Sequence, residues 1–176
     1  YYQSRYTFFH RYDDGICLDR ESWYSVTPEI IAQDIAKRVT TQLSDFTWPI
    51  RVVDLFCGAG GDSIAQADFG HEVLSNDVDP LKLQLLRHNA GIYHVQSLIT
   101  PSNTDAFRLV ETLDPTQHHV VLLSPPWGGP RRNYTALETL DDLFPGLERL
   151  WESCVARFHH TALYLPRRVD ADRLCS

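Results

Sequence analysis

The sequence predicts an α/β fold of the Rossmann-like type, with a mostly parallel sheet, helices on both faces and a short aromatic-rich extension at the N-terminus. Two observations lead to this prediction. Short apolar segments alternate with helical patterns, as buried parallel strands alternate with the helices that connect them. A glycine-rich turn at residues 58–61 also follows the first core segment and opens a helix, the place where such folds bind ligands.

The predicted extension covers residues 1–48, and the predicted core covers residues 49–176. In the extension, a short helix is expected at residues 5–12. A longer helix is expected from Pro28 to about Thr40, because Thr27 can cap its N-terminus and proline suits the first turn. Apolar residues also recur along it at helical spacing.

The core elements follow in order from their apolar patterns. The expected strands are residues 50–56, 72–76, 93–97, 119–123 and 161–165, with the weakest pattern at 93–97. The expected helices are residues 62–69, 80–90, 106–113 and 137–158, the last interrupted by Pro145-Gly146.

Composition excludes several classes of protein. The net charge of −7 argues against a protein that coats long nucleic acids by bulk charge. No apolar run approaches the ~20 residues of a membrane-spanning helix, so no membrane partner is expected. None of the four cysteines stands at zinc-ligand spacing with the histidines, so no metal is expected. The chain has no methionine, and we expect a monomeric catalytic domain of a longer protein.

The glycine turn favours a nucleoside ligand. It lacks the lysine of a phosphate-binding loop and the third glycine of a dinucleotide fingerprint, while an acidic residue, Asp77, ends the next strand, where a ribose diol needs an acceptor. S-adenosylmethionine is the common nucleoside cofactor of this kind. Asp105 would face the adenine of such a cofactor, or it caps the helix that follows. Asp79 shares the binding of the ribose with Asp77, or it caps the next helix. The candidate cofactor residues here are Asp54, Phe56, Cys57, Gly58, Ala59, Gly60, Asp77, Asp79 and Asp105.

A second motif, Ser124-Pro125-Pro126-Trp127, directly follows the fourth predicted strand. Prolines stiffen the backbone and leave carbonyls free to accept hydrogen bonds. Ser124 and the Pro125 carbonyl can therefore orient an exocyclic amine, and Trp127 can stack on its base. These three residues are the predicted catalytic residues of a class I S-adenosylmethionine-dependent methyltransferase. The alternative is a rigid turn with a core tryptophan.

These motifs together resemble the trimethylguanosine synthase family of RNA cap guanosine-N2 methyltransferases, over nearly the whole chain. The matching segments are FFHRYDDGICLDR from Phe8, WYSVTPEII from Trp23, VVDLFCGAGG from Val52, NDVDP from Asn76, VLLSPPWGGP from Val121 and YLPR from Tyr164. The SPPWGGP string and the DDGI and SVTPE strings are specific to the family, whereas the glycine turn is not.

The resemblance implies transfer of methyl groups to the 2-amino group of a 7-methylguanosine cap, giving di- or trimethylguanosine on small nuclear and nucleolar RNAs. It implies that Trp127 stacks on the cationic base, and that Ser25, Val26 and Thr27 close the cofactor pocket. It also implies a nuclear location, in the nucleolus or Cajal body, with some protein in the cytoplasm. The implied substrate contacts are Ser124, Pro126, Trp127, Tyr134, Arg167 and Arg20.

Two departures from the family pattern leave alternatives open. Cys17 stands where the family often has a basic residue, and the fold normally ends with two further strands after the fifth. These departures motivate one alternative, a cap-binding module without catalysis on the same fold. The other alternative is a methyltransferase for another exocyclic amine in RNA, which the glycine turn and the SPPW motif allow.

Overall fold

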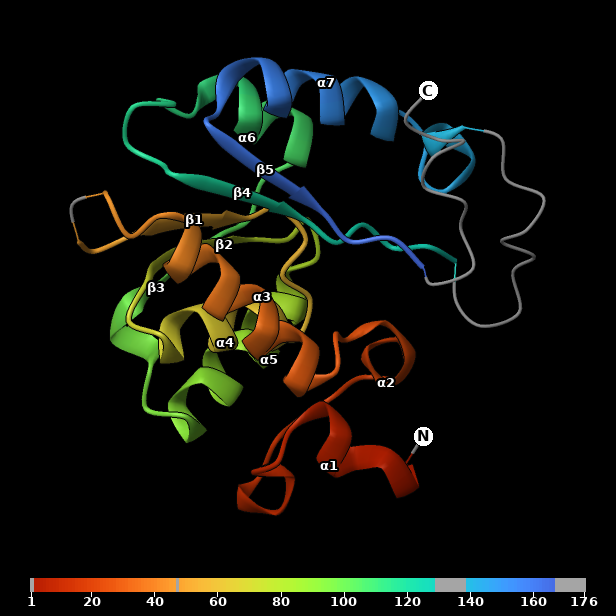
Figure 1. Cartoon of the computed structure of the whole chain (residues 1–176). Coiled ribbons are helices and arrows are strands. Elements are labelled where there is room, and N and C mark those ends of the chain that lie inside the picture. The colour runs from red at the N-terminus through yellow and green to blue at the C-terminus, as the bar shows by residue number, and fades with distance from the viewer. Residues whose placement is uncertain (1, 47, 129–138, 167–176) are drawn as a thin grey trace.

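The computed structural model describes residues 2–46, 48–128 and 139–166, and its centre is a parallel sheet (Figure 1). Five strands pair in the order β3-β2-β1-β4-β5, and every pairing is parallel. The predicted α/β fold is thus confirmed. The strands are β1 (Arg51–Asp54), β2 (Glu72–Asn76), β3 (Ile99–Ser102), β4 (Val120–Leu123) and β5 (His160–Leu163).

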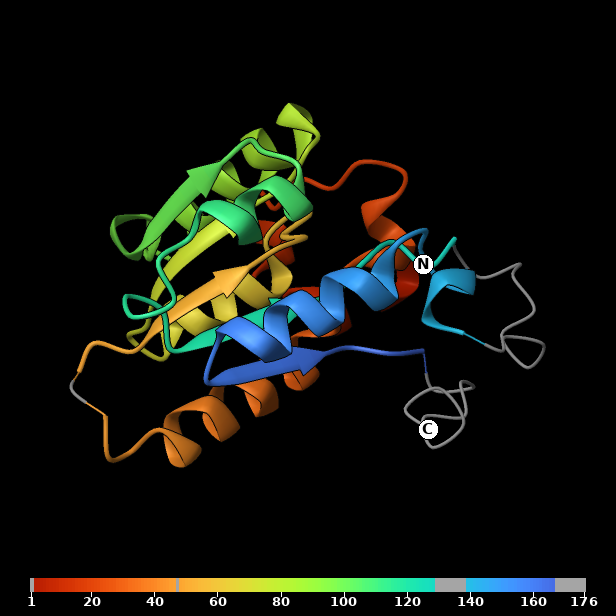
Figure 2. The ribbon, with the colours of Figure 1, turned by 90° about the horizontal axis from the view of Figure 1, so that it is seen from above.

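Helices cover both faces of the sheet, as Figures 1 and 2 show. On one face, α3, α4 and α5 contribute to a core that includes Val52 and Leu122, and on the other face α6 and α7 pack on Val53 and Val121. None of the helices in the described segments has the length and apolar character needed to cross a membrane. The α-helices are α1 (Arg5–Phe8), α2 (Ser22–Ser25), α3 (Glu29–Gln42), α4 (Gly61–Asp68), α5 (Pro80–Ile92), α6 (Ala106–Thr112) and α7 (Leu147–Arg157).

The third strand lies later in the sequence than expected. The prediction of a strand at residues 93–97 is wrong, because residues 93–95 form the turn that ends α5 and a 3-10 helix, Gln96–Leu98, follows. His94 has a left-handed φ of 61°, and the Val95 N–H donates to the Ala90 carbonyl at 3.1 Å. The strand itself is Ile99–Ser102, where only Ile99 is fully buried. The apolar signal of this edge strand is therefore weak.

Two predicted helices are shorter than expected. Helix 5–12 ends at Phe8, because Phe9 is extended, and a separate 3-10 turn follows at Tyr12–Asp14. Of the predicted helix 137–158, residues 137 and 138 lie outside the described residues. A 3-10 turn, Leu140–Asp142, comes first, and α7 begins only after Gly146, whose φ is 79°. The two further strands expected from the family would fall outside the described residues.

The extension carries an aromatic cluster around Trp23, buries Phe9 and Ile16 in the main core and is also attached to it by ion pairs. Trp23 packs its ring near Tyr12, Tyr2 and Phe8, at centroid distances of 5.5, 6.0 and 6.4 Å. Lys82 of α5, whose side chain is only 7% exposed, pairs with Asp19 of the extension at 2.8 Å. This attachment places the segment before α3 beside the carboxyl ends of the strands.

His71 makes the fold sensitive to acid. It is fully buried beside Trp48, with Nδ1 donating to Gln66 at 2.7 Å, and burial lowers its pKa from 6.5 to about 4. The unfolded chain therefore binds a proton between these pH values that the folded chain does not. Through His71, the free energy of unfolding should fall by about 2 kcal/mol from pH 7 to pH 5. The raised pKa of Asp54, described below, acts in the opposite direction over this range, so the contribution of His71 is the difference in pH dependence between the wild type and His71→Gln, measured by urea titration. Equal pH dependence of the two proteins would contradict the assignment.

Candidate active site

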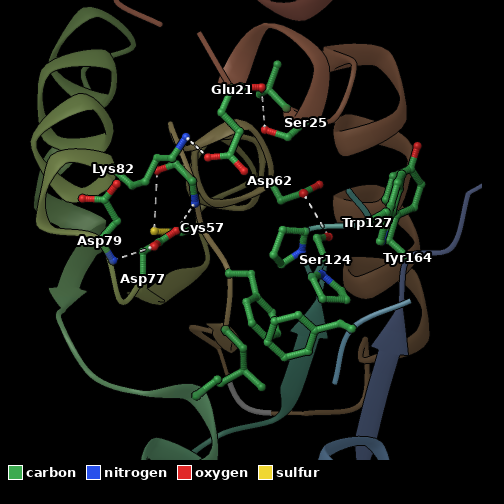
Figure 3. Close-up of a pocket in the computed structure, with 18 of the residues that line it drawn as sticks. Glu21, Ser25, Cys57, Asp62, Asp77, Asp79, Lys82, Ser124, Trp127 and Tyr164 are labelled. Atoms are coloured by element: carbon green, nitrogen blue, oxygen red, sulfur yellow. Dashed lines mark hydrogen bonds and ion pairs between the residues drawn. The ribbon is translucent and has the colours of Figure 1, made fainter. Parts of the chain in front are cut away.

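A pocket of about 670 Å³ opens at the carboxyl ends of β1, β2 and β4 (Figure 3). This volume is in the range of small-molecule sites. Its walls are the glycine turn after β1, the acidic turn after β2, the loop after β4 and the segment Ser25–Thr27 of the extension. Ligands of open parallel sheets bind at this edge, beside the central strand.

The glycine turn is shaped by two residues with positive φ. Gly58 has a φ of 52° and lines the pocket, and a Cβ atom built there would meet nothing within 4 Å. Its N–H donates to Asp77 at 3.0 Å, which fixes the turn after β1 to the end of β2. Gly60 has a φ of 100°, and a Cβ there would lie 2.6 Å from Leu86. Gly58 therefore leaves space for a ligand, whereas Gly60 leaves space for α5.

Most of the predicted site residues line this one pocket, although they come from distant parts of the sequence. They are Ser25, Thr27, Phe56, Cys57, Gly58, Ala59, Asp77, Asp79, Asp105, Ser124, Pro125, Pro126 and Trp127. Asp54, Gly60 and Arg20 are not among the lining residues, and Arg20 is exposed. Tyr134 and Arg167 lie outside the described residues.

Asp54 lies behind the pocket wall. Its carboxylate is fully buried and accepts the Ser63 hydroxyl at 2.6 Å and the Phe56 N–H at 3.3 Å. Burial, together with the charge of Asp62, raises the pKa of Asp54 to about 7. The visible role of Asp54 is to hold the start of the glycine turn against α4, and its predicted contact with a cofactor stays a prediction.

The other acidic residues of the site combine a structural contact with a place in the pocket. Asp79 caps α5 by accepting the Leu81 N–H at 2.8 Å, and Asp105 caps α6 by accepting the Arg108 N–H at 3.1 Å. Asp77 is more buried, and burial raises its pKa. Its two oxygens accept the N–H groups of Gly58 and Asp79. Each of its oxygens still has a further lone pair for a ligand.

The loop after β4 brings an acceptor and an aromatic ring to the opposite wall. The Ser124 hydroxyl donates to Asp62 at 3.4 Å, and Pro125 is buried. The Trp127 ring packs against Tyr164, with centroids 5.0 Å apart and planes 40° from parallel. Tyr164 thus fixes the orientation of the ring that is predicted to stack on a base.

The lining residues that were not predicted from the sequence include Asp62, Lys82 and Tyr164. Asp62, in the first turn of a helix, is typical of a residue that stabilises a helix N-terminus. Lys82 lies on an otherwise ordinary helix, and its partner Asp19 is 63 residues away. Tyr164 belongs to the YLPR segment, in which the resemblance assigned a role only to Arg167.

The pocket is acidic. Its ionisable lining includes the carboxylates of Glu21, Asp62, Asp77, Asp79 and Asp105. Among the described residues, Lys82 is the single lysine or arginine of the lining, and it is paired with Asp19 and Glu21 at 2.8 and 3.2 Å. Such a pocket favours a positively charged ligand. Within the described residues, no cluster of three or more His, Cys, Asp or Glu side chains is arranged to hold a metal ion.

Comparison with known proteins identifies the family. The family model described as RNA cap guanine-N2 methyltransferase matches residues 50–176. The chain belongs to this family. The trimethylguanosine synthase of Schizosaccharomyces pombe is 36% identical over 180 residues, which cover 100% of this chain and 73% of that protein. The trimethylguanosine synthase of Saccharomyces cerevisiae is 30% identical over 179 residues, which cover 99% of this chain and 56% of that protein.

A solved structure supports the fold of this cap methyltransferase family member. The crystal structure of an S-adenosylmethionine-dependent methyltransferase from Agrobacterium tumefaciens superposes with a TM-score of 0.58 at 19% identity. The match covers 81% of this chain and 47% of that chain. The predicted class I methyltransferase fold is therefore confirmed, and with the family match the chain is that of an enzyme.

The pocket fits the cofactor of this fold. An open backbone at Gly58 allows close approach, Asp77 keeps acceptor capacity at the end of β2, and the acidic lining matches the positive sulfonium. Asp77 would hold the ribose, and Asp105 would hold the adenine amino group.

Two glycine substitutions should separate binding from stability. Gly58→Ala should cost about 1 kcal/mol of unfolding free energy through its positive φ, while its methyl group occupies ligand space and weakens binding of S-adenosylhomocysteine. Gly60→Ala adds a collision with Leu86 and should cost about 3 kcal/mol. Thermal unfolding and calorimetry would measure both. Equal destabilisation by the two variants would contradict the different roles.

Proposed function

We propose that this domain transfers methyl groups from S-adenosylmethionine to the exocyclic 2-amino group of a 7-methylguanosine RNA cap. The observation that carries the proposal is the position of Ser124, Pro125 and Trp127 on the pocket wall opposite the glycine turn, in a chain of the cap guanine-N2 methyltransferase family. An amine acceptor and a base-stacking ring thus face the cofactor residues across one cavity.

The loop after β4 provides the substrate contacts of this proposal. Trp127 stacks on the base, which is cationic after N7 methylation, and gains a cation–π contribution of roughly 0.5–2 kcal/mol. The Ser124 hydroxyl and the Pro125 carbonyl accept hydrogen bonds from the 2-amino group and direct its lone pair toward the cofactor. Pro126 lines the same wall.

The cofactor contacts come from the opposite wall. S-adenosylmethionine supplies a methyl group on a positively charged sulfur, which an amine can displace directly. The residues of this chain orient the two partners and exclude water from between them, and orientation alone can contribute about 7–11 kcal/mol in favourable cases. Cys57, Ala59 and Phe56 complete this wall, and Ser25 and Thr27 close it from the extension.

Several finer features belong to the proposal. The phosphates of the cap are bound by Tyr134, Arg167 and Arg20, of which only Arg20 is described, at an exposed position outside the pocket. The substrates are small nuclear and nucleolar RNAs, which receive di- or trimethylguanosine caps. The domain acts as a monomer in the nucleus, in the nucleolus or Cajal body and in part in the cytoplasm, without a metal and without a membrane.

The deciding experiment is methyl transfer from labelled S-adenosylmethionine to 7-methyl-GDP, with GDP as the unmethylated control. More product on 7-methyl-GDP than on GDP is expected, by roughly 2- to 30-fold, because only the methylated base is cationic. The ratio of mono- to dimethylated product would define the extent of the reaction. Transfer to RNA amines without transfer to 7-methyl-GDP would overturn the cap as substrate.

Two substitutions should divide the site into its halves. Trp127→Ala should weaken 7-methyl-GDP binding by about tenfold or more and leave S-adenosylhomocysteine binding unchanged. Asp77→Ala should weaken S-adenosylhomocysteine binding and leave 7-methyl-GDP binding unchanged, because it removes the proposed ribose acceptor. Fluorescence or calorimetric titration of each ligand would measure this. Unchanged turnover in both variants would show that the site is assigned wrongly.

A further inference from the structure

Asp62 has acceptor capacity that no role described above uses. It is the second residue of α4 and lines the pocket, although only 9% of the residue is exposed. Its Oδ2 accepts the Thr27 hydroxyl at 2.6 Å and the Ser124 hydroxyl at a long 3.4 Å, while its Oδ1 has no hydrogen-bond partner among the described residues. An ionised carboxylate has about four acceptor positions, and buried ones are normally filled.

The surroundings of Asp62 make its negative charge costly. Burial raises the pKa of Asp62, and the charge of Asp62 contributes to the raised pKa of Asp54 and of Tyr164. Lys82, the basic residue of the lining, forms ion pairs with Asp19 and Glu21. A positively charged ligand group would offset this cost, since a buried charge needs a partner.

The position of Asp62 indicates which part of a ligand it meets. In Figure 3, Asp62 lies between Ser25 and Ser124, on the Trp127 side of the pocket and away from Asp77 and Asp79. A cofactor with its ribose at Asp77 and its methyl group directed to Ser124 leaves its amino-acid part for the wall formed by α4 and the extension. That wall carries Thr27 and Asp62.

We infer that the Asp62 carboxylate, and not that of Asp54, accepts hydrogen bonds from the α-ammonium group of the cofactor's amino-acid part. This inference rests on S-adenosylmethionine as the cofactor of the proposed function. Asp54 ends β1 but does not line the pocket, and its oxygens accept from Ser63 and Phe56. Asp62 lines the pocket and keeps free acceptor positions.

This assignment gives Asp62 three simultaneous partners: Thr27 of the extension, Ser124 of the loop after β4 and the cofactor. Cofactor binding would then hold the extension and the loop after β4 to the same carboxylate. Asp62 is a cofactor-binding and positioning residue in this arrangement, and no proton transfer is assigned to it.

The test compares two ligands that differ only at the amino-acid part. S-adenosylhomocysteine carries the α-ammonium group, whereas 5′-methylthioadenosine lacks the whole amino-acid part. Calorimetry on the intact domain should show that Asp62→Asn weakens S-adenosylhomocysteine by about tenfold or more. Binding of 5′-methylthioadenosine should stay within about twofold of wild type, which also reports an intact pocket. Asp62→Ala should weaken S-adenosylhomocysteine further, because the asparagine oxygen still accepts one hydrogen bond.

Asp68→Asn is the matched control, since it makes the same change of charge at an exposed position of the same helix. It should leave both affinities unchanged. Equal weakening of both ligands by Asp62→Asn, or no weakening of S-adenosylhomocysteine, would overturn the inference. A wild-type domain that does not bind S-adenosylhomocysteine would overturn the cofactor assignment as well. None of these measurements needs a cap, so the substrate of the proposed function is tested separately.

Discussion

The parallel pairing of β1 with both β2 and β4 is the constraint on which the site depends. Because the three strands run in the same direction, their carboxyl ends and the turns that follow lie at one edge of the sheet. This pairing places Gly58, Asp77 and Ser124 around one cavity although they span 67 positions of the sequence. The hydrogen bond from the Gly58 N–H to Asp77 then fixes the positions of two of these turns relative to each other.

The extension completes the pocket through two attachments of different character. One is the ion pair between the buried Lys82 and Asp19. Removing one partner would leave an unpaired charge, and this loss of stability would exceed the net stabilisation that the intact pair provides. The other is the hydrogen bond that the Thr27 hydroxyl donates to Asp62 at the N-terminus of α4. Close packing accompanies this second attachment, since a Cβ at Gly61 would lie 2.8 Å from Val26. The extension therefore forms part of the site wall.

The net charge of −7 has a local counterpart in the pocket, where carboxylates predominate among the charged lining residues. An acidic surface disfavours long RNA, whereas an acidic pocket favours a cationic base and a cationic sulfonium cofactor. Burial, which removes these carboxylates from water, raises the pKa of Asp62 and of Asp77. These carboxylates line one cavity at the edge of the sheet, and positive ligands would stabilise them.

Sequence by itself determined the fold class, four of the five strands and about half of the lining residues, because apolar periodicity and contiguous motifs are local signals. It failed at β3, where a half-exposed edge strand has little apolar pattern, and at the ends of α1 and α7, where single backbone conformations stop a helix. Tertiary structure alone decided that Asp62 lines the pocket while Asp54 lies behind it. Asp54 and Asp62 flank the same glycine-turn segment of the sequence. Their different positions depend on their hydrogen-bond partners, Ser63 for Asp54 and Thr27 and Ser124 for Asp62, which only the folded chain brings to them.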